Sequence, residues 1–402
     1  MNDFELLCPK PRIGPGAPIA LLCLLGAIGQ AHAGGKVVAW GRNDYQQATV
    51  PAAATNALAV AGGLYHSLAL AADGGILGWG DGSDGQTNAP SSATNVISIA
   101  SGGYHGLALG SNGIVSAWGD FSYDQTSVPG NLTNVVAVSG GFYHSLALKA
   151  DGTVVAWGNE TNNFQDGVDY DQALVPSGLT NVVTISAGGW HSLALLADGT
   201  VTAWGLNSAG QGTVPPGLSN VVAIAAGGAH NLARKADGTI LAWGDNLYGQ
   251  TNVPASATNV VAIAAGGWHS LALKADGTVS AWGDNDYPNG NGTNRSYSGQ
   301  ATVPANLTNV AAIAAGGWHS LALLGAAPPA RNVLLTNTAW RANQFSISLP
   351  TQSGRVYVLE HKDSLSASNW TAAPPQPGNG GLEKLTDPAA TVPERFYRVL
   401  RW

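Results

Sequence analysis

The chain has 402 residues and a formal net charge of −7, and only 10% of its residues are charged. Residues 34–325 hold 17 acidic and 7 basic side chains, a net charge of −10, and such an excess of negative charge disfavours binding to nucleic acid phosphates. No apolar run is long enough to span a bilayer. We therefore expect neither a nucleic acid partner nor a membrane span.

Residues 1–33 have the features of a secretory signal peptide. Lys10 and Arg12 precede an apolar run over residues 19–28, and the sequence AHA at 31–33 has the small-x-small form of a cleavage site. We expect cleavage after this site and a secreted protein, extracellular or periplasmic. Both cysteines of the chain, at positions 8 and 23, would leave with the peptide, so the mature protein would rely on packing without disulfides.

Residues 34–325 are built from one repeated unit, seen most clearly as VVAIAAGGWHSLALKADGTVSAWG at 260–283. It contains three short apolar runs, and Asp276-Gly277 separates the second from the third. Asp-Gly is favoured in two-residue turns whose central residues both have positive φ, which predicts a β-hairpin here.

Two residues mark the repeat and allow it to be counted. A Trp-Gly pair recurs, usually every 39 residues, at Trp40, Trp79, Trp118, Trp157, Trp204, Trp243 and Trp282. A histidine recurs in step with it, at His66, His105, His144, His191, His230, His269 and His319. Short strands at this period are typical of a β-propeller, in which each sheet buries its faces against its neighbours, and seven repeats predict seven blades.

The first and last repeats are incomplete in complementary ways. GGKVVAWG at 34–41 supplies a third strand without its partners, whereas AAIAAGGWHSLALL at 311–324 supplies the first two strands alone. Pairing the two segments would complete the seventh blade and leave no open sheet edge. Gly34-Gly35 would then stand where the other repeats have their turn.

A polar segment follows each Trp-Gly pair, and its Gly, Pro and Asn content predicts a loop with one short outer strand. Two of these segments are longer, at 160–172 and 287–299. Insertions in repeat proteins often face a partner, but harmless surface variation explains them equally well.

The repeat pattern G-G-x-H-S-L-A-L and V-x-A-W-G-x-N resembles the regulator of chromosome condensation repeat family over residues 34–325. The short period and the Gln-x-x-Val-Pro step at 300–304 are similar to the family's secreted bacterial branch, typified by beta-lactamase inhibitory protein II. The resemblance implies a propeller whose aromatic loop residues grip a target protein.

The repeat pattern stops at Ala326. Residues 326–331 predict a Pro-containing linker, and residues 332–402 contain clusters of β-forming residues between Gly and Pro breaks. The expected fold is therefore all-β, with a seven-bladed β-propeller followed by a small C-terminal β-sandwich-like domain.

The residues do not combine into a recognisable catalytic or metal site. A zinc ion needs three or four converging ligands, whereas equivalent histidines on successive blades diverge around a ring, so we expect each histidine to bond to neighbouring backbone. Two acidic loops could offer calcium ligands, although such loops are usually just solvated: Asp284, Asp286, Asn289 and Asn291, or Asp166, Asp169 and Asp171. We expect no enzymatic activity, no catalytic residue, no cofactor and no bound metal.

The residue before each histidine is the strongest indication of function. Six of the seven are aromatic, and position 229 is Ala: Tyr65, Tyr104, Tyr143, Trp190, Trp268 and Trp318. Packing between blades would explain large apolar residues, but Tyr and Trp join apolar area to a polar tip, as binding surfaces do. We expect these six to form a binding face, with the three Trp residues as anchors and with Leu64 and Phe142 extending it.

The sequence thus predicts a secreted, non-enzymatic module that binds an extracellular or periplasmic protein. One alternative is a carbohydrate-binding propeller, in which the same rings would stack on glycans. A second is a guanine-nucleotide exchange factor-like activity, as the eukaryotic namesake of the family has. That activity requires a cytosolic or nuclear GTPase, which the signal segment disfavours.

Overall fold

The computed structural model describes residues 4–6, 34–158, 170–288, 295–325, 336–341, 344–350, 356–362, 371–373, 376–377, 382–387 and 396–401. All regular structure among them is β-strand, which confirms the predicted fold class. No segment within these ranges could cross a membrane as a helix.

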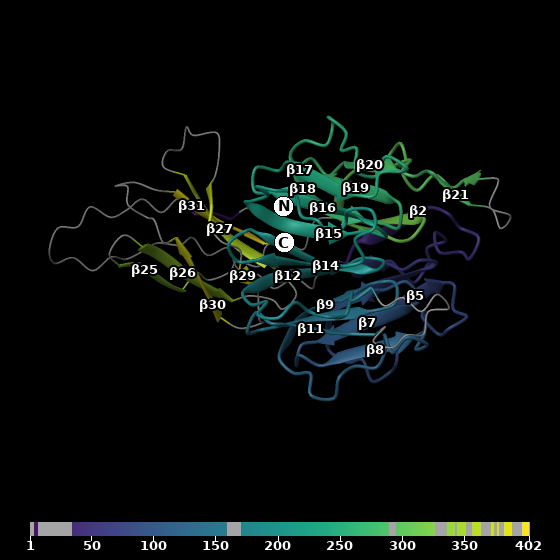
Figure 1. Cartoon of the computed structure of the whole chain (residues 1–402), viewed down its shortest axis with the longest axis horizontal. Helices are drawn as coiled ribbons and strands as arrows, with labels where there is room; N and C mark the ends of the chain where they lie inside the picture. The colour runs from purple at the N-terminus through teal and green to yellow at the C-terminus, as the bar shows by residue number, and fades with distance from the viewer. Residues whose placement is uncertain are drawn as a thin grey trace.

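Residues 34–325 form seven antiparallel sheets of three strands each (Figure 1). The first three sheets are β3 (Ala57–Gly62), β4 (His66–Ala71) and β5 (Ile76–Gly80); β6 (Val96–Ser101), β7 (His105–Gly110) and β8 (Val115–Gly119); and β9 (Val135–Gly140), β10 (Ser145–Lys149) and β11 (Val154–Trp157). The next three are β12 (Val182–Ala187), β13 (His191–Leu196) and β14 (Val201–Gly205); β15 (Val221–Ala226), β16 (His230–Lys235) and β17 (Ile240–Gly244); and β18 (Val260–Ala265), β19 (His269–Lys274) and β20 (Val279–Gly283).

The seventh sheet joins the two ends of the repeat region. β2 (Lys36–Gly41) pairs along its whole length with β24 (His319–Leu324), which also pairs with β23 (Val310–Ala315). The carbonyl of Gly35 accepts a hydrogen bond from Ala57 N at 3.0 Å, the same bond that the turn glycine Gly277 makes to Val310. The structure therefore confirms that Gly34-Gly35 replaces a turn and that the last blade closes the ring.

The first strand of each blade lies innermost. β3, β6, β9, β12, β15, β18 and β23 contact one another in a closed circle. These inner strands are rich in Ala, Val and Ser, as in VVAIAA of β15, and small side chains allow seven strands to approach one axis. The arrangement confirms a β-propeller of seven blades.

The core lies between adjacent blades. Trp118 of the second blade packs against Leu68 and Leu70 of the first blade. Trp79 packs in the same way against Leu321 and Leu323 of the closing blade. Because each apolar cluster is shared by two blades, no blade has a complete core of its own.

The hairpin turns differ from the prediction. In the first blade, Ala71 O accepts from Gly74 N at 3.0 Å and Ala71 N donates to Gly75 O at 2.8 Å, and only Gly74 has a positive φ, of 86°. This is a three-residue loop with a glycine bulge instead of a two-residue turn. Asp73 has an ordinary φ, as this loop type requires, and its Oδ1 accepts from Gly75 N at 2.9 Å.

The predicted outer strand after each Trp-Gly pair was also wrong. The described polar segments form turns, and only the last insertion forms strands there, the hairpin β21 (Asp286–Pro288) and β22 (Arg295–Tyr297). Most of the other insertion, residues 159–169, lies outside the described residues.

The C-terminal strands form two further antiparallel sheets. One has the order β25 (Thr336–Arg341), β26 (Gln344–Pro350) and β30 (Leu382–Asp387). The other contains β31 (Phe396–Arg401), β27 (Val356–Lys362), β28 (Thr371–Ala372) and β29 (Gln376–Pro377). Phe345, Ile347, Tyr357, Leu359 and Leu385 are buried among them.

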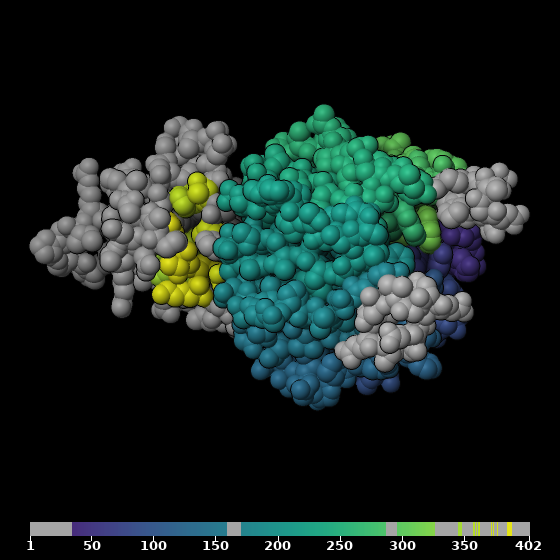
Figure 2. Space-filling model, viewed as in Figure 1, coloured from purple at the N-terminus to yellow at the C-terminus, as the bar shows by residue number. Residues whose placement is uncertain are grey.

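The C-terminal sheets lie beside the propeller, on the side away from the β21–β22 hairpin (Figures 1 and 2). β1 (Phe4–Leu6), from the segment predicted to be a signal peptide, pairs with β31. Removal of residues 1–33 would therefore open one edge of this sheet.

Candidate binding face

Each blade histidine is completely buried and bonds to the next blade, not to the neighbouring backbone as the sequence had led us to expect. His230 Nε2 lies 3.0 Å from Ser270 Oγ of the following blade, and His319 Nε2 closes the circle at 2.8 Å from Ser67 Oγ. His191 bonds to Asn231 Oδ1 instead. The histidines therefore fasten neighbouring blades together.

The hydrogen bonds also fix the tautomer of His230. Ser270 Oγ donates to the carbonyl of Gln250 at 2.9 Å, so its oxygen is left to accept from His230 Nε2–H. Burial lowers the pKa of His230 to about 3, and burial likewise lowers the pKa of the other six below the ordinary value. A neutral, buried donor is a structural element, not an acid–base catalyst.

The residue three positions before each histidine must be glycine, because the imidazole occupies the space that a Cβ would need. A Cβ added at Gly227 would lie 2.4 Å from Cε1 of His230, and one at Gly63 would lie 2.1 Å from Cε1 of His66. The imidazole thus packs directly on glycine backbone, which explains why Gly precedes His at this spacing in every blade.

A buried glutamine in each blade was missed by the sequence analysis. Gln47 Oε1 accepts from the backbone N of Tyr45 at 2.9 Å, while its carbonyl accepts from Trp79 Nε1 and Ser67 Oγ of the next blade. Equivalent residues are Gln86, Gln125, Gln172, Gln211, Gln250 and Gln300. Their recurrence in step with the Trp-Gly pair was the signal that could have revealed them.

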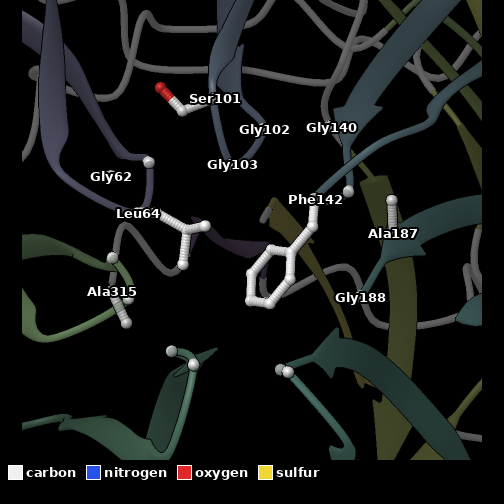
Figure 3. A pocket seen from close by; sticks show the side chains of 18 of the residues that line it. Gly62, Leu64, Ser101, Gly102, Gly103, Gly140, Phe142, Ala187, Gly188 and Ala315 are labelled. Carbon is white, nitrogen blue, oxygen red and sulfur yellow. The ribbon is translucent and has the colours of Figure 1, made fainter. Parts of the chain in front are cut away.

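A pocket of about 140 Å³ lies on the propeller axis (Figure 3). Its wall is mainly glycine backbone from all seven blades. The two large side chains in it, Leu64 and Phe142, extend toward the centre (Figure 3). Backbone N–H groups around this wall donate to the next blade in a closed circle, as in Leu64 to Gly103 at 3.0 Å and Gly317 to Gly63 at 3.0 Å.

The six predicted aromatic residues lie together around this pocket. Trp268 stacks on Trp318 with ring centroids 4.3 Å apart, and Trp318 stacks on Tyr65 at 5.3 Å. Tyr65, Tyr104, Tyr143 and Trp190 continue the series with centroids 6.0 to 6.3 Å apart. We call these six residues the aromatic belt.

The belt is interrupted at Ala229. Phe142 bridges this interruption from the inside, since its ring centroid lies 5.1 Å from that of Trp190 and 6.5 Å from that of Trp268. Phe142 therefore contacts both ends of the belt, whereas Leu64 is buried with 5% of its surface exposed. Trp318 is also buried, at 7% exposed, so it supports its neighbours more than it offers contact area of its own.

The segments that follow the third strands surround the belt. Tyr45 and Tyr123 extend it outward, with ring centroids 5.0 Å from Tyr65 and 4.9 Å from Tyr143. Burial is the main cause that raises the pKa of Tyr65, Tyr104 and Tyr143. Their hydroxyls therefore stay protonated at neutral pH.

The described residues contain no group of three or more His, Cys, Asp or Glu that could hold a metal ion. In one of the two acidic loops, Asp284 Oδ1 accepts from Asp286 N at 3.0 Å. Asn289, Asn291, Asp166 and Asp169 lie outside the described residues.

Six segments of the chain match the regulator of chromosome condensation (RCC1) repeat: residues 58–86, 96–125, 135–164, 182–211, 221–250 and 260–287. Six of the seven blades therefore match the RCC1 repeat. Four of the matches end on the buried glutamine, which makes this residue part of the RCC1 repeat. The unmatched blade is the closing one, whose third strand comes from the opposite end of the sequence.

Solved structures share the fold of these RCC1 repeats. Prp20p from Saccharomyces cerevisiae superposes with a TM-score of 0.58 at 22% identity, covering 72% of this chain and 91% of its own. Yeast RCC1 (Prp20) in its complex with Kap60 gives 0.57 at 21%, covering 78% and 96%. Human WBSCR16 gives 0.54 at 20%, covering 72% and 98%. No curated protein matches the sequence.

Proposed function

We propose that this protein is a secreted, non-enzymatic propeller that binds another protein through the aromatic belt. The observation that carries the proposal is the arc of six Tyr and Trp rings around one end of the axis, with neighbouring ring centroids 4.3 to 6.3 Å apart. Aromatic residues supply most of the affinity at protein interfaces, because they bury a large area at little entropic cost.

The position of the belt supports this role. The chain leaves the propeller at Gly325, after β24, at the end where the hairpin turns lie. The belt lies at the other end, next to the residues that follow the third strands, as the bond from Asp81 N to Tyr65 O illustrates. The chain therefore leaves the propeller at the end opposite the belt.

The central pocket adds a feature that a protruding side chain of a partner would fit. Its volume of about 140 Å³ is too small for most ligands of drug size. Leu64 and Phe142 give it an apolar centre within a polar, backbone-lined wall. An aromatic belt around a small central pocket suits a protein loop better than a free metabolite.

Proteins of similar fold bind other proteins: Prp20p has been characterised for binding to Gsp1p and histones, and it has been solved in complex with Kap60. These likenesses support a protein partner here as a class, and they identify no particular one.

The test is capture of partners from extracellular and periplasmic fractions by the chain that begins at Gly34, compared with its Trp268→Ala variant. We expect the variant to lose capture by on the order of 30-fold, equivalent to about 2 kcal/mol. Ile114→Ala is the matched control, because Ile114 is 60% exposed next to a hairpin turn at the opposite end.

Melting of both variants is measured alongside capture. Lost capture with a small change in melting temperature supports the proposal. Unchanged capture with a large fall in melting temperature would mean that Trp268 only fills space between blades. Capture of glycans or of a small GTPase in place of other proteins would favour the alternative functions.

A further inference from the structure

The two ends of the propeller differ strongly in charge. The described segments around the aromatic belt hold nine acidic side chains: Asp44, Asp81, Asp84, Asp120, Asp124, Asp171, Asp245, Asp284 and Asp286. Among the side chains that the structure describes at this end, Arg42 is the one base. These ten side chains carry a net charge of −8, and strand β22 at the same end adds Arg295.

The end with the hairpin turns is nearly neutral by comparison. It holds five acidic and five basic residues, a net charge of 0: Asp73, Asp151, Asp198, Asp237 and Asp276, with Lys36, Lys149, Arg234, Lys235 and Lys274. Lys149 and Asp151 are paired at 3.0 Å. The negative charge of the propeller is thus concentrated around the belt.

Arg42 shows how the belt holds a cation. Its guanidinium lies 5.3 Å from the ring centroid of Tyr65, 5.4 Å from that of Trp318 and 5.8 Å from that of Tyr45. Its Nε donates to Asp44 Oδ2 at 2.9 Å. Aromatic rings and a carboxylate together form a place for a guanidinium, and such contacts are favourable even at partly exposed sites.

The same elements recur in other blades, but with a different residue at the position of Arg42. That residue is Asp81 beside Tyr65, Asp120 beside Tyr104 and Asp284 beside Trp268, each bonded through its backbone N to the carbonyl of the belt residue. The blades of Asp81 and Asp120 present rings and partly exposed carboxylates without an arginine at this position, whereas Asp284 is buried. An incoming cationic side chain could repeat there what Arg42 does in the closing blade.

We propose that the partner of the aromatic belt is a basic protein segment, rich in Arg or Lys, whose cationic side chains lie over the belt rings between the surrounding aspartates. This proposal rests on the proposed function and adds the class of partner to it. Complementary charge accelerates association and excludes acidic competitors, while the rings supply contact area.

The test uses a hexa-arginine peptide as the probe, with hexa-glutamate and hexa-serine peptides as comparisons. Binding to the chain that begins at Gly34 is followed by tryptophan fluorescence and by calorimetry. We expect saturable binding of hexa-arginine alone, weakened by added salt because the attraction between exposed charges is screened.

Two matched double variants locate the site. Asp84→Asn with Asp124→Asn removes two exposed charges beside the belt, and we expect on the order of tenfold weaker binding. Asp73→Asn with Asp151→Asn removes the same charge at the opposite end, where Asn112 already occupies the equivalent turn position. This control should leave binding unchanged.

Arg42→Ala gives a prediction of opposite sign. The substitution removes a positive charge and uncovers Tyr65 and Trp318, so hexa-arginine should bind several-fold more tightly. If only the net charge of the protein mattered, the two double variants would weaken hexa-arginine binding equally.

The proposal is overturned if hexa-arginine does not bind, if the two double variants weaken binding equally, or if Arg42→Ala loosens it. Those results leave the proposed function standing as long as Trp268→Ala still abolishes capture of a natural partner. Intact capture by Trp268→Ala would overturn the proposed function. If hexa-arginine also bound tightly in that case, its binding site would have to lie away from the belt.

Discussion

The indole Nε1–H of Trp79 donates to the backbone carbonyl of Gln47 at 2.9 Å, across the boundary between two blades. The same bond recurs at all seven boundaries, at 2.9 to 3.2 Å. The glutamine comes from the segment that follows the third strand of the preceding blade. Each blade is thus hydrogen-bonded to the loop that follows the third strand of the preceding blade. A substitution at one boundary therefore affects two blades.

Deletion of residues 34–41 should open the ring. The closing blade would lose β2, and Trp40 would no longer donate to Gln300 O across the boundary with the sixth blade. Loss of a buried Trp alone typically costs about 3 to 5 kcal/mol, so we expect a sharp fall in melting temperature. The control is the chain that begins at Gly34, and equal melting of the two chains would refute closure through β2.

Acid should destabilise the propeller well before its carboxylates titrate. Burial lowers the pKa of the seven histidines to about 3 or 4, against about 6.5 in the unfolded chain. Below pH 6.5 the histidines of the unfolded chain bind protons, whereas those of the folded chain stay neutral. The free energy of unfolding is therefore highest above pH 6.5 and decreases as the pH falls toward 4.

Each histidine contributes about 1.4 kcal/mol per pH unit in this window. Melting temperatures measured from about pH 7.5 down to about pH 4.5 should therefore fall steeply and recover after neutralisation. A melting temperature that stays constant over this range would show that the histidines are accessible to protons in the folded state.

Ser270→Ala should leave His230 Nε2–H without its acceptor. An unsatisfied buried donor costs about 1 to 3 kcal/mol. Ser270→Asn should restore most of the loss, because Asn231 already accepts from His191 and donates to Gln211 O at the next boundary. Denaturant unfolding of the parent, Ser270→Ala and Ser270→Asn proteins tests this ranking of stability. Equal stability of all three would mean that the bond from His230 to residue 270 does not stabilise the fold.

Gly227→Ala should destabilise the fold through contact alone. The new Cβ would lie 2.4 Å from His230 Cε1 and 2.5 Å from Gly266 O, and forced overpacking of this kind costs about 1 to 3 kcal/mol. Gly130→Ala is the control, since nothing lies within 4 Å of a Cβ at that exposed position. The difference between their unfolding midpoints is the readout.

Export with cleavage after Ala33 predicts a secreted product that begins at Gly34 and contains no cysteine. Intact mass measures the first point, and thiol labelling of the denatured product measures the second. A product that retains Met1 would keep β1 paired with β31 and would count against the signal peptide.

The blade number and the closure could be predicted because Trp-Gly and His recur at fixed spacing and mark strand ends. The role of Gln47 could not be predicted, because a glutamine in a polar loop looks like any solvated residue. The bond from Trp79 Nε1 is accepted by its backbone carbonyl, which does not depend on residue type. The Asp-Gly turns were misjudged because Asp-Gly suits both a two-residue turn and a three-residue loop with a glycine bulge.

The aromatic belt was predictable as a set of positions but not as a surface. Residue type placed Tyr65 and Trp318 at equivalent sites, whereas their stacking under Arg42 depends on the closing blade bringing together residues from opposite ends of the repeats. The burial of Trp318 has the same origin.

The break in the closing blade falls at a hairpin turn, the same place where every other blade turns continuously from its second strand to its third. With Gly325 linked to Gly34, residues 34–325 would form an endless loop of strands that can be cut at another turn, for example between Asp198 and Gly199, without losing any strand pair. A circularly permuted propeller made in this way keeps all seven blades, and the present starting point is one of seven equivalent places to begin reading the same ring.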